Sequence, residues 1–385
     1  MKRNEKKFYK NKLVKVVFLL ALVYGGFGNY NQFYLHYGYG NDTFWGEVFR
    51  FFLSRYAEYI AVILFGVVVV YFERNQYTRR RILTLMLFML FLHIGAPFFL
   101  SIPEPSYGQN LPFQSTLPSP HAPGTMLFIV FALGAFLIGR RFDCGWNCQC
   151  VGFRETVGRP WRETTIKTGT AWKLRHIKWF FFSAMLVYLV LIFTPPTEFS
   201  ARYFNTFWKT VVAIYFLSAI FIPLTGNRAV CRFICPFGSL YGWMQKISPF
   251  VRIRADKEKC VSCLNCEKEC DMGIPINTLV HKVGQIKSVE CMGCGRCIQI
   301  CQKGVLRFED VRDYLWALVR YVKNIFIWGE KRELKEVIGC KQESKDVTKE
   351  KKVKHDRLEL SDIIFALTLS GTVTLAMIGL ALLFQ

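Results

Sequence analysis

The sequence predicts a mostly α-helical membrane protein, in which six to seven transmembrane helices are joined to a small cysteine-rich α+β domain. Three observations lead to this class. The 385 residues are 52% hydrophobic, and their charged residues gather in blocks between long apolar runs. The chain has a formal net charge of +22, with basic residues grouped beside those runs. Eight of the 14 cysteines fall in one short polar stretch with regular spacing.

This cysteine-rich stretch contains the spacing C-x2-C-x2-C-x3-C twice. The first run is Cys260, Cys263, Cys266 and Cys270, and the second is Cys291, Cys294, Cys297 and Cys301. Two-cluster bacterial ferredoxins have this spacing, and the fourth cysteine of each run binds the other cluster. The spacing therefore predicts two [4Fe-4S] clusters. One would be held by Cys260, Cys263, Cys266 and Cys301, and the other by Cys291, Cys294, Cys297 and Cys270.

The same eight cysteines have two alternative uses, in paired zinc sites or in disulfides. Zinc sites usually place two C-x2-C pairs around a longer spacer, without a triplet followed by a fourth cysteine. Disulfides need an oxidising compartment, and the charge pattern described below argues against one. Proline usually follows the fourth cysteine, but Asp271 and Gln302 stand there. This departure bears on cluster potential and exposure more than on ligation.

Long apolar runs predict the transmembrane helices. The expected spans are Leu13 to Phe33, Ala57 to Phe72, Ile82 to Leu100, Met126 to Gly139, Trp179 to Thr194, Thr206 to Leu224 and Ile363 to Phe384. The first run follows a basic segment, but no clear small-x-small cleavage motif comes after it. We therefore interpret it as an uncleaved span and not as a signal peptide.

Basic residues lie on alternate connections between these spans. The N-terminus, 73–81, 140–178 and the region after Leu224 are basic, whereas 34–56, 101–125 and 195–205 are sparse in Lys and Arg. The positive-inside rule places the basic side in the cytoplasm. We therefore expect a multi-pass protein of the inner (cytoplasmic) membrane with its ferredoxin-like domain in the cytoplasm. Membrane lipid accounts for the positive charge, and no nucleic-acid-binding module is present.

The expected domain order follows from these patterns. A transmembrane bundle occupies 1–250, the ferredoxin-like domain 251–310, an amphipathic helix and a charged tether 311–360, and a last transmembrane helix 361–385. Apolar residues recur at helical spacing from Val311 to Trp328, which predicts a helix that lies on the membrane surface or packs on the ferredoxin-like domain. The segment from Glu330 to Arg357 is the tether, and Cys340 within it is interpreted as an incidental thiol.

Two further cysteine pairs, each with the spacing C-x3-C, follow the ends of two inward-running spans. They are Cys144 with Cys148, and Cys231 with Cys235, and Cys150 is an extra cysteine after the first pair. Their matching positions predict an internal repeat. Four converging thiolates would suit a third cluster or another soft metal. Redox-active thiols and structural thiols are the alternatives. Gln149 stands where Pro236 stands in the other copy.

The run from Cys231 to Gly238, the run from Cys144 to Cys148 and the ferredoxin spacing together resemble the NapH/NosR/CcoG group of membrane polyferredoxins. The resemblance covers roughly Met126 to Gln302 and is nearest to the NapH type, with Gln149 as a departure. It implies electron transfer between the quinone pool, as menaquinol or ubiquinol, and a partner redox protein or reductase. The chain would then be the electron-transfer subunit of a quinol dehydrogenase.

Two functions of other classes stay open at this point. The chain could be a maturation factor that reduces a metal or cofactor for a respiratory enzyme, as the CcoG resemblance implies. It could also be a redox-sensing regulatory membrane protein. Oxidation of quinol, as against reduction of a metal such as copper, separates electron transfer from the first alternative. Loss of regulation without loss of electron flow after replacement of Cys144 or Cys231 would favour the second.

A few ionisable residues near the spans are further candidates. His93 lies within the third expected span and could accept a proton from quinol, although hydrogen bonding between helices is the commoner role. Glu58 is a second candidate with an interfacial charge as its alternative. Arginines flank the thiol pairs and could offset thiolate charge or act as topology signals. They are Arg140, Arg141, Arg228 and Arg232. No catalytic motif is present, so no catalytic residue is assigned.

Overall fold

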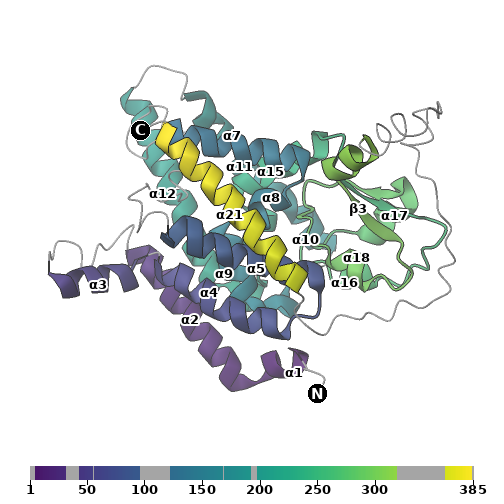
Figure 1. The fold of residues 1–385 in the computed structure, drawn as a ribbon, viewed down its shortest axis with the longest axis horizontal. Helices are drawn as coiled ribbons and strands as arrows, with labels where there is room; N and C mark the ends of the chain where they lie inside the picture. Colours follow the sequence, from purple (N-terminus) through teal and green to yellow (C-terminus); the bar gives the residue numbers. More distant parts are fainter. Residues whose placement is uncertain are drawn as a thin grey trace.

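The computed structural model describes residues 5–31, 43–54, 56–95, 122–167, 169–191, 197–318 and 360–383. A bundle of helices and a smaller domain with a short β-sheet lie side by side (Figure 1). The fold is mostly helical, as the sequence predicts, and the small sheet belongs to the cysteine-rich domain.

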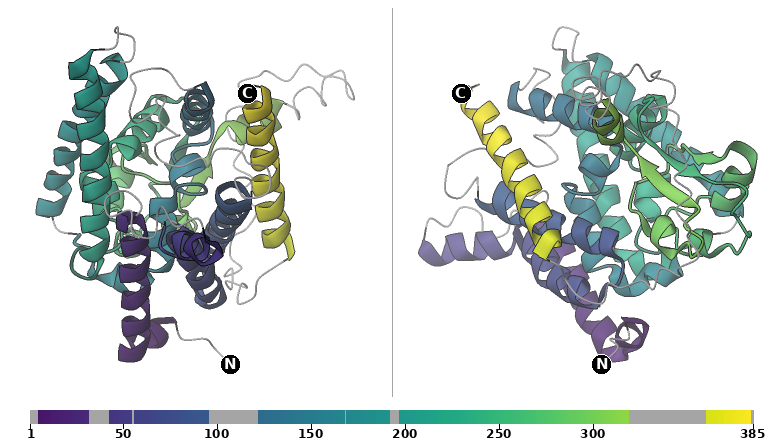
Figure 2. Two further views of the ribbon diagram at one scale, coloured as in Figure 1. Left: turned by 90° about the vertical axis from the view of Figure 1, so that its left-hand side faces the viewer. Right: turned by 45° about the vertical axis from the view of Figure 1, so that its right-hand side comes forward.

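Each of the seven expected spans corresponds to a helix over its described residues. These helices are α2 (Lys12–Tyr30), α4 (Tyr56–Phe72), α5 (Gln76–Phe88) with the π-helix η2 (Met89–Gly95), α7 (Ala122–Leu137), α11 (Lys178–Leu191), α12 (Glu198–Ile220) and α21 (Leu360–Leu383). Helices α12 and α21 lie on opposite sides of the bundle (Figure 2). Helix α5 packs against α4 and α21, and α12 packs against α2 and α11.

Shorter helices connect the long ones or lie beside them. They are α1 (Glu5–Lys10), α3 (Phe44–Phe52), α8 (Arg141–Cys144), α9 (Gln149–Thr156), η3 (Arg159–Thr164), α10 (Gly169–Leu174), η4 (Arg175–Ile177), α13 (Ile222–Thr225), α14 (Ala229–Phe233) and α15 (Pro236–Ile247). All eight residues of α9 are buried. The segment 140–178, expected as a basic cytoplasmic connection, therefore contributes a helix to the interior of the molecule.

One continuous helical stretch within the described residues, Ala171–Leu191, is long and apolar enough to cross a membrane. Shorter apolar helices cover Tyr56–Phe72, Lys209–Ile220 and Asp362–Thr372. Several large apolar side chains on the bundle point outward, among them Phe180 (72% exposed) and Leu375 (70% exposed). Apolar side chains on the outside of a bundle suit a lipid environment. The number of membrane crossings and their orientation stay predictions.

The C-terminal helix α21 is fastened to α5 by buried charge. Asp362 is fully buried and forms an ion pair with Arg79, with 3.1 Å between Oδ2 and Nη2, and a second one with Arg80. A ring contact between Trp146 and Phe365, with centroids 6.3 Å apart, adds a contact farther along α21. The last helix is therefore an integral part of the bundle.

The cysteine-rich domain is built around a three-stranded antiparallel sheet with the order β2-β1-β3. Its strands are β1 (Arg252–Ala255), β2 (Gln285–Ile286) and β3 (Leu306–Glu309), and Ile253 faces Ile286 on one side and Phe308 on the other. The helices are α16 (Asn265–Lys268), α17 (Ile276–Val283) and α18 (Arg296–Ile300). This arrangement confirms the predicted α+β domain, whose apolar core includes Ile274 and Val280.

Residues 311–318 are helical, in agreement with the start of the expected helix. Tyr314 anchors this segment to the domain, because its hydroxyl accepts a hydrogen bond from Arg252 at 3.0 Å and its ring contacts Phe250. Leu315 and Trp316 are more than half exposed. The remainder of the expected helix to Trp328 and the tether with Cys340 lie outside the described residues.

Candidate iron–sulfur centres

Both C-x2-C-x2-C loops of the cysteine-rich domain follow the same backbone path. In the first run, the residues two and four positions after Cys260 are Ser262 and Leu264, with φ of 51° and 57°. In the second run the equivalent residues are Gly293 and Gly295, with φ of 65° and 76°. These left-handed residues curl each loop in the same way, so that successive thiols can face one centre. The loop repeat is the structural counterpart of the sequence repeat.

The four cysteines expected to bind the second cluster surround one cavity. Cys270 comes from the end of the first run, and the other three come from the second run: Cys291, Cys294 and Cys297. Apolar residues, including Met272 and Ile286, form most of the remaining lining, together with charged residues of the buried ionic network described below. Four thiols around one cavity form a donor set that fits a cubane cluster. The cavity is thus lined by the four cysteines that the spacing assigns to the second cluster. That they bind a cluster stays a prediction.

Electrostatic effects connect the fourth cysteine of each run with the other run. Burial raises the pKa of the Cys266 thiol to about 11, and the negative charges of Cys301 and Cys263 contribute to the increase. Burial likewise raises the pKa of Cys270 to about 12, with a contribution from Cys294. Each fourth cysteine therefore lies within electrostatic range of the other run.

The described cysteines are not arranged to bind a single metal ion. Within the described residues, no three or more His, Cys, Asp or Glu side chains are grouped so that they could hold a single metal ion. In a cubane, by contrast, each cysteine binds a different iron atom. All 13 cysteines of the described ranges are free of disulfides.

The two C-x3-C segments also fold alike. Cys148 immediately precedes α9 with φ −61° and ψ 113°, and Cys235 immediately precedes α15 with φ −57° and ψ 111°. The N–H of each donates to the carbonyl five residues earlier, on Asp143 and Val230, at 2.9 Å in both copies. Each second cysteine thus stands at the N-cap position of a helix, where the helix dipole opposes the effect of burial on the thiol.

The structure brings these two pairs together. Burial raises the pKa of Cys144 well above its usual value, and the charges of Cys148 and Cys235 add to the shift. Burial raises the pKa of Cys235 to about 12, again with contributions from Cys231 and Cys148. The thiols of the two pairs therefore lie within electrostatic range of each other. Cys150 lies inside α9, at the position that Phe237 takes in α15.

N–H groups are directed at three of the four sulfur atoms. Arg140 Nε lies 3.4 Å from Cys144 Sγ, Arg228 Nη1 lies 3.8 Å from Cys231 Sγ, and the backbone N–H of Gly238 donates to Cys235 Sγ at 3.3 Å. Such donors stabilise thiolates that bind a cluster or a soft metal. The donor set of this group, which we call the thiol site (Cys144, Cys148, Cys231 and Cys235), therefore fits a third centre.

Arg140 joins the thiol site to the cysteine-rich domain. Its side chain, 1% exposed, also donates to the carbonyl of Cys231 at 3.4 Å and to the carbonyl of Val289 at 3.1 Å. Its backbone N–H donates to Gln245, whose amide donates in turn to the carbonyl of Cys291 at 3.0 Å. The loop that begins the second cluster run is therefore attached directly to the thiol site.

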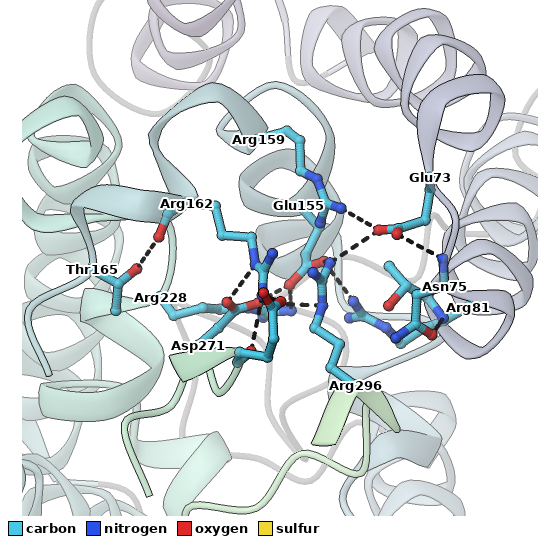
Figure 3. Close-up of polar contacts among 12 residues, drawn as sticks. Glu73, Asn75, Arg81, Glu155, Arg159, Arg162, Thr165, Arg228, Asp271 and Arg296 are labelled. Carbon is cyan, nitrogen blue, oxygen red and sulfur yellow. Dashed lines mark hydrogen bonds and ion pairs between the residues drawn. The ribbon is translucent and has the colours of Figure 1, made fainter. Parts of the chain in front are cut away.

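A buried ionic network forms a second connection between the two parts (Figure 3). Glu155 of α9 accepts from Arg228 Nε at 2.8 Å and pairs with Arg81 of α5. Arg296 of α18 lies 3.3 Å from Glu73 and 3.6 Å from Asp271. Arg159 pairs with Glu73, and Arg162 Nε lies 2.6 Å from Asp271 Oδ1.

Sequence reasoning missed this network because acidic and basic partners lie far apart in the chain. Asp271, noted only as the replacement of a proline, is 5% exposed and holds the cysteine-rich domain to Arg162. The arginines that flank the thiol pairs are all at most 8% exposed, so they have partners inside the protein in addition to any role in topology. An acidic residue inside a basic segment, such as Glu155, is the sequence feature that could have indicated a buried ion pair.

Polar residues of the first C-x3-C segment face His93 and Tyr59. His93, on the π-helix η2, lies with Nε2 3.1 Å from Asn147 Oδ1, and Asn147 donates to Asp143 at 3.1 Å. The Tyr59 hydroxyl donates to Gln149 Oε1 at 2.7 Å, and its ring centroid lies 5.3 Å from that of His93. The departure at Gln149 therefore has a partner inside the bundle.

The other candidate, Glu58, is fully buried and accepts a hydrogen bond from the Tyr215 hydroxyl. The side chain is therefore enclosed by the protein, and the alternative that Glu58 is an interfacial charge stays a prediction. Glu58 and Tyr59 are adjacent on α4, so that helix carries polar groups to two separate buried networks.

Comparison with protein families agrees with both cysteine regions. A 4Fe-4S dicluster domain matches residues 252–302, and a 4Fe-4S binding domain matches twice, at residues 121–169 and 208–254. The second family therefore covers each C-x3-C segment once. No solved structure is a significant match.

Several relatives match about half of the chain. The chain is 28% identical over 207 residues to YccM of Escherichia coli, 30% over 185 residues to the uncharacterized protein MJ0749 of Methanocaldococcus jannaschii, and 24% over 243 residues to the ferredoxin-type protein NapH of Escherichia coli. These alignments cover 48%, 47% and 57% of this chain, and 55%, 69% and 84% of the relatives. The chain thus spans little more than half of YccM.

Proposed function

The chain belongs to the NapH/NosR-type family of ferredoxin-type proteins, and we propose that it passes electrons between the quinone pool and a partner redox protein. In this proposal the eight cysteines of the ferredoxin-like domain hold two [4Fe-4S] clusters, and the thiol site holds a third cluster. A single metal ion at the thiol site is not favoured, because no such grouping of ligands is found among the described residues. The bound clusters supply one-electron carriers. The protein contributes their position, the N–H donors around their sulfur ligands and the exclusion of water.

One observation carries this proposal: the Arg140 side chain contacts a sulfur of the thiol site and the loop that leads into the second cluster run. Cys144 of the thiol site and Val289 of the cysteine-rich domain, more than a hundred residues apart in the chain, are therefore both in contact with one buried residue. The loop of the second run contacts the bundle at Tyr77 and Arg141, whereas Val261, Cys263 and Leu264 of the first run are exposed. This difference supports a series of carriers from the bundle, through the thiol site and the second cluster, to the first cluster.

We place the quinol end of the series beside His93. Electrons leave a quinol together with protons, so the site needs a proton acceptor close to the first carrier. His93 contacts Asn147, which directly precedes Cys148 of the thiol site. The π-helix that carries His93 supports a functional role, because such segments are frequent at functional sites. A multi-pass membrane location with the clusters in the cytoplasm follows from the positive-inside rule.

The test uses full-length protein purified without oxygen. Iron and acid-labile sulfide analysis is expected to give about twelve irons per chain if the thiol site holds a cubane, and about eight if it does not. Electron paramagnetic resonance would then be recorded after addition of a menaquinol analogue. Signals of reduced clusters support quinol oxidation. Zinc or disulfides at the eight cysteines would overturn the proposal.

A further inference from the structure

The two cluster loops differ in what surrounds them, although their backbones match. The second loop is pressed against the bundle: a Cβ added at Gly295 would lie 2.6 Å from the Tyr77 ring, and one at Gly293 would lie 3.3 Å from Arg141. At Gly295 glycine is therefore required for space as well as for its positive φ, and Gly293 fits closely against Arg141. The second loop is already covered by a docking contact with the bundle.

The first loop has side chains at the equivalent positions, and they face solvent. Leu264 is 42% exposed with a positive φ of 57°, a conformation that disfavours a leucine. Val261 is 64% exposed, Ile300 beside Cys301 is 39% exposed, and Cys263 is exposed. We call Val261, Cys263, Leu264 and Ile300 the port surface. It is the uncovered counterpart of the face that the second loop presents to the bundle.

Lysines dominate the exposed charges around the port surface. Among the exposed side chains of residues 256–304 there are five lysines and one glutamate. The lysines are Lys257, Lys259, Lys268, Lys282 and Lys303. Lys259 precedes Cys260, and Lys303 follows Cys301. Ser262 lies 2.8 Å from His281 of α17, which brings the Lys282 end of that helix to the loop. An apolar centre with a basic rim fits an acidic partner surface.

We propose that the port surface is the docking site for an acidic one-electron carrier protein, which exchanges electrons with the cluster at Cys260, Cys263, Cys266 and Cys301. This inference rests on the proposed function and names the partner end of the series. In each encounter one electron leaves the reduced centre, which is oxidised by one equivalent, and reduces the carrier by one equivalent. The exposed cysteine favours a redox partner over an anionic lipid surface, because lipid would cover the cluster without using it.

The experiment uses the full chain in nanodiscs of zwitterionic lipid, with flavodoxin as the acidic probe. Binding is measured by titration at several salt concentrations, and electron transfer by stopped-flow absorbance. The test variant is Lys259→Glu with Lys303→Glu. The matched control is Lys173→Glu with Lys246→Glu, which changes net charge equally at exposed positions elsewhere on the chain. We expect the test variant to weaken binding about tenfold or more and to flatten its salt dependence. The control should change binding less than about twofold.

A second variant, Leu264→Gly, tests the apolar centre without a change of charge. Glycine suits the positive φ, so the loop and its cluster should persist, and the cluster signal in electron paramagnetic resonance should be unchanged. Slower electron transfer to flavodoxin with normal cluster content supports docking at the port surface. Equal losses in test and control variants would overturn it, as would binding of anionic vesicles in place of flavodoxin. Quinol reduction of the clusters, measured separately, reports on the proposed function alone.

Discussion

The two C-x3-C segments share one backbone and differ in their surroundings. The first has Asp143, Asn147 and Gln149, and the second has Val230, Ile234 and Pro236 at the matching positions. The polar residues of the first segment reach His93 and Tyr59 inside the bundle.

The second segment faces the cysteine-rich domain through its arginines. Arg228 pairs with Glu155, which lies 3.8 Å from Arg296 of that domain. Arg232 donates to the carbonyl of Ile166 at 2.6 Å and lies close to Gly273, where an added Cβ would meet its guanidinium at 2.7 Å. The first segment therefore contacts the bundle through its polar residues and the cysteine-rich domain through Arg140. The second segment lacks polar residues at the matching positions and reaches the domain through its arginines.

The strongest test of this comparison removes one thiol from each copy. Cys144→Ser and Cys235→Ser should each abolish the third centre, because a site with four ligands spans both copies. Iron content should fall by about four atoms per chain in both variants. Cys150→Ser, two residues after Cys148 in α9, should keep the iron content of the unsubstituted protein. Unequal losses of iron in Cys144→Ser and Cys235→Ser would mean that the two C-x3-C segments do not share one centre.

Glu155→Gln should have the largest effect on stability. It leaves the buried guanidinium groups of Arg81 and Arg228 without their carboxylate, which costs about 3–5 kcal/mol of unfolding free energy. Denaturation in detergent, followed by tryptophan fluorescence, measures the loss. The exposed Glu163→Gln is the control, with an expected change below about 0.5 kcal/mol. A neutral result for Glu155→Gln would mean that the network does not hold the two parts together.

His93→Gln should affect the first copy alone. Reduction of the clusters by menaquinol should slow about tenfold or more, because the ring that would accept the proton is gone. Reduction by dithionite, which needs no quinol, should keep its rate. Tyr188→Phe, at a buried position of another helix, serves as the control. If both reductants slowed equally, His93 would be a packing residue of the bundle.

Gln149→Pro should have the smallest effect, since it gives the first copy the residue of the second. Proline is tolerated at the first position of a helix, so α9 should persist. The Tyr59 hydroxyl loses its partner, at a cost of about 1 kcal/mol. Iron content should be unchanged and quinol-dependent reduction modestly slower. Loss of iron would show that Gln149 shapes the thiol site itself.

The features that could be predicted are those set by local sequence. The spacing of the ferredoxin cysteines predicts two curled loops, since three thiols a few residues apart need the same turn in each run. Uniformly apolar runs predict the long helices. The burial of α9 could not be predicted, because Arg154 and Glu155 read as surface charges until their partners are known. The role of Asp271 as an ion-pair partner also could not be predicted, because Arg162 and Arg296 lie elsewhere in the chain.

By itself, then, the order of residues determined the ligand spacing, the apolar helices and the duplicated C-x3-C turns, all of which depend on neighbours in the chain. Only the tertiary structure decided that Arg140 lies between the thiol site and the second cluster loop, and that one cluster loop is covered while the other is open. Both features depend on contacts between charges and surfaces that lie far apart in the chain. A charged side chain can be buried only where such partners offset the loss of water.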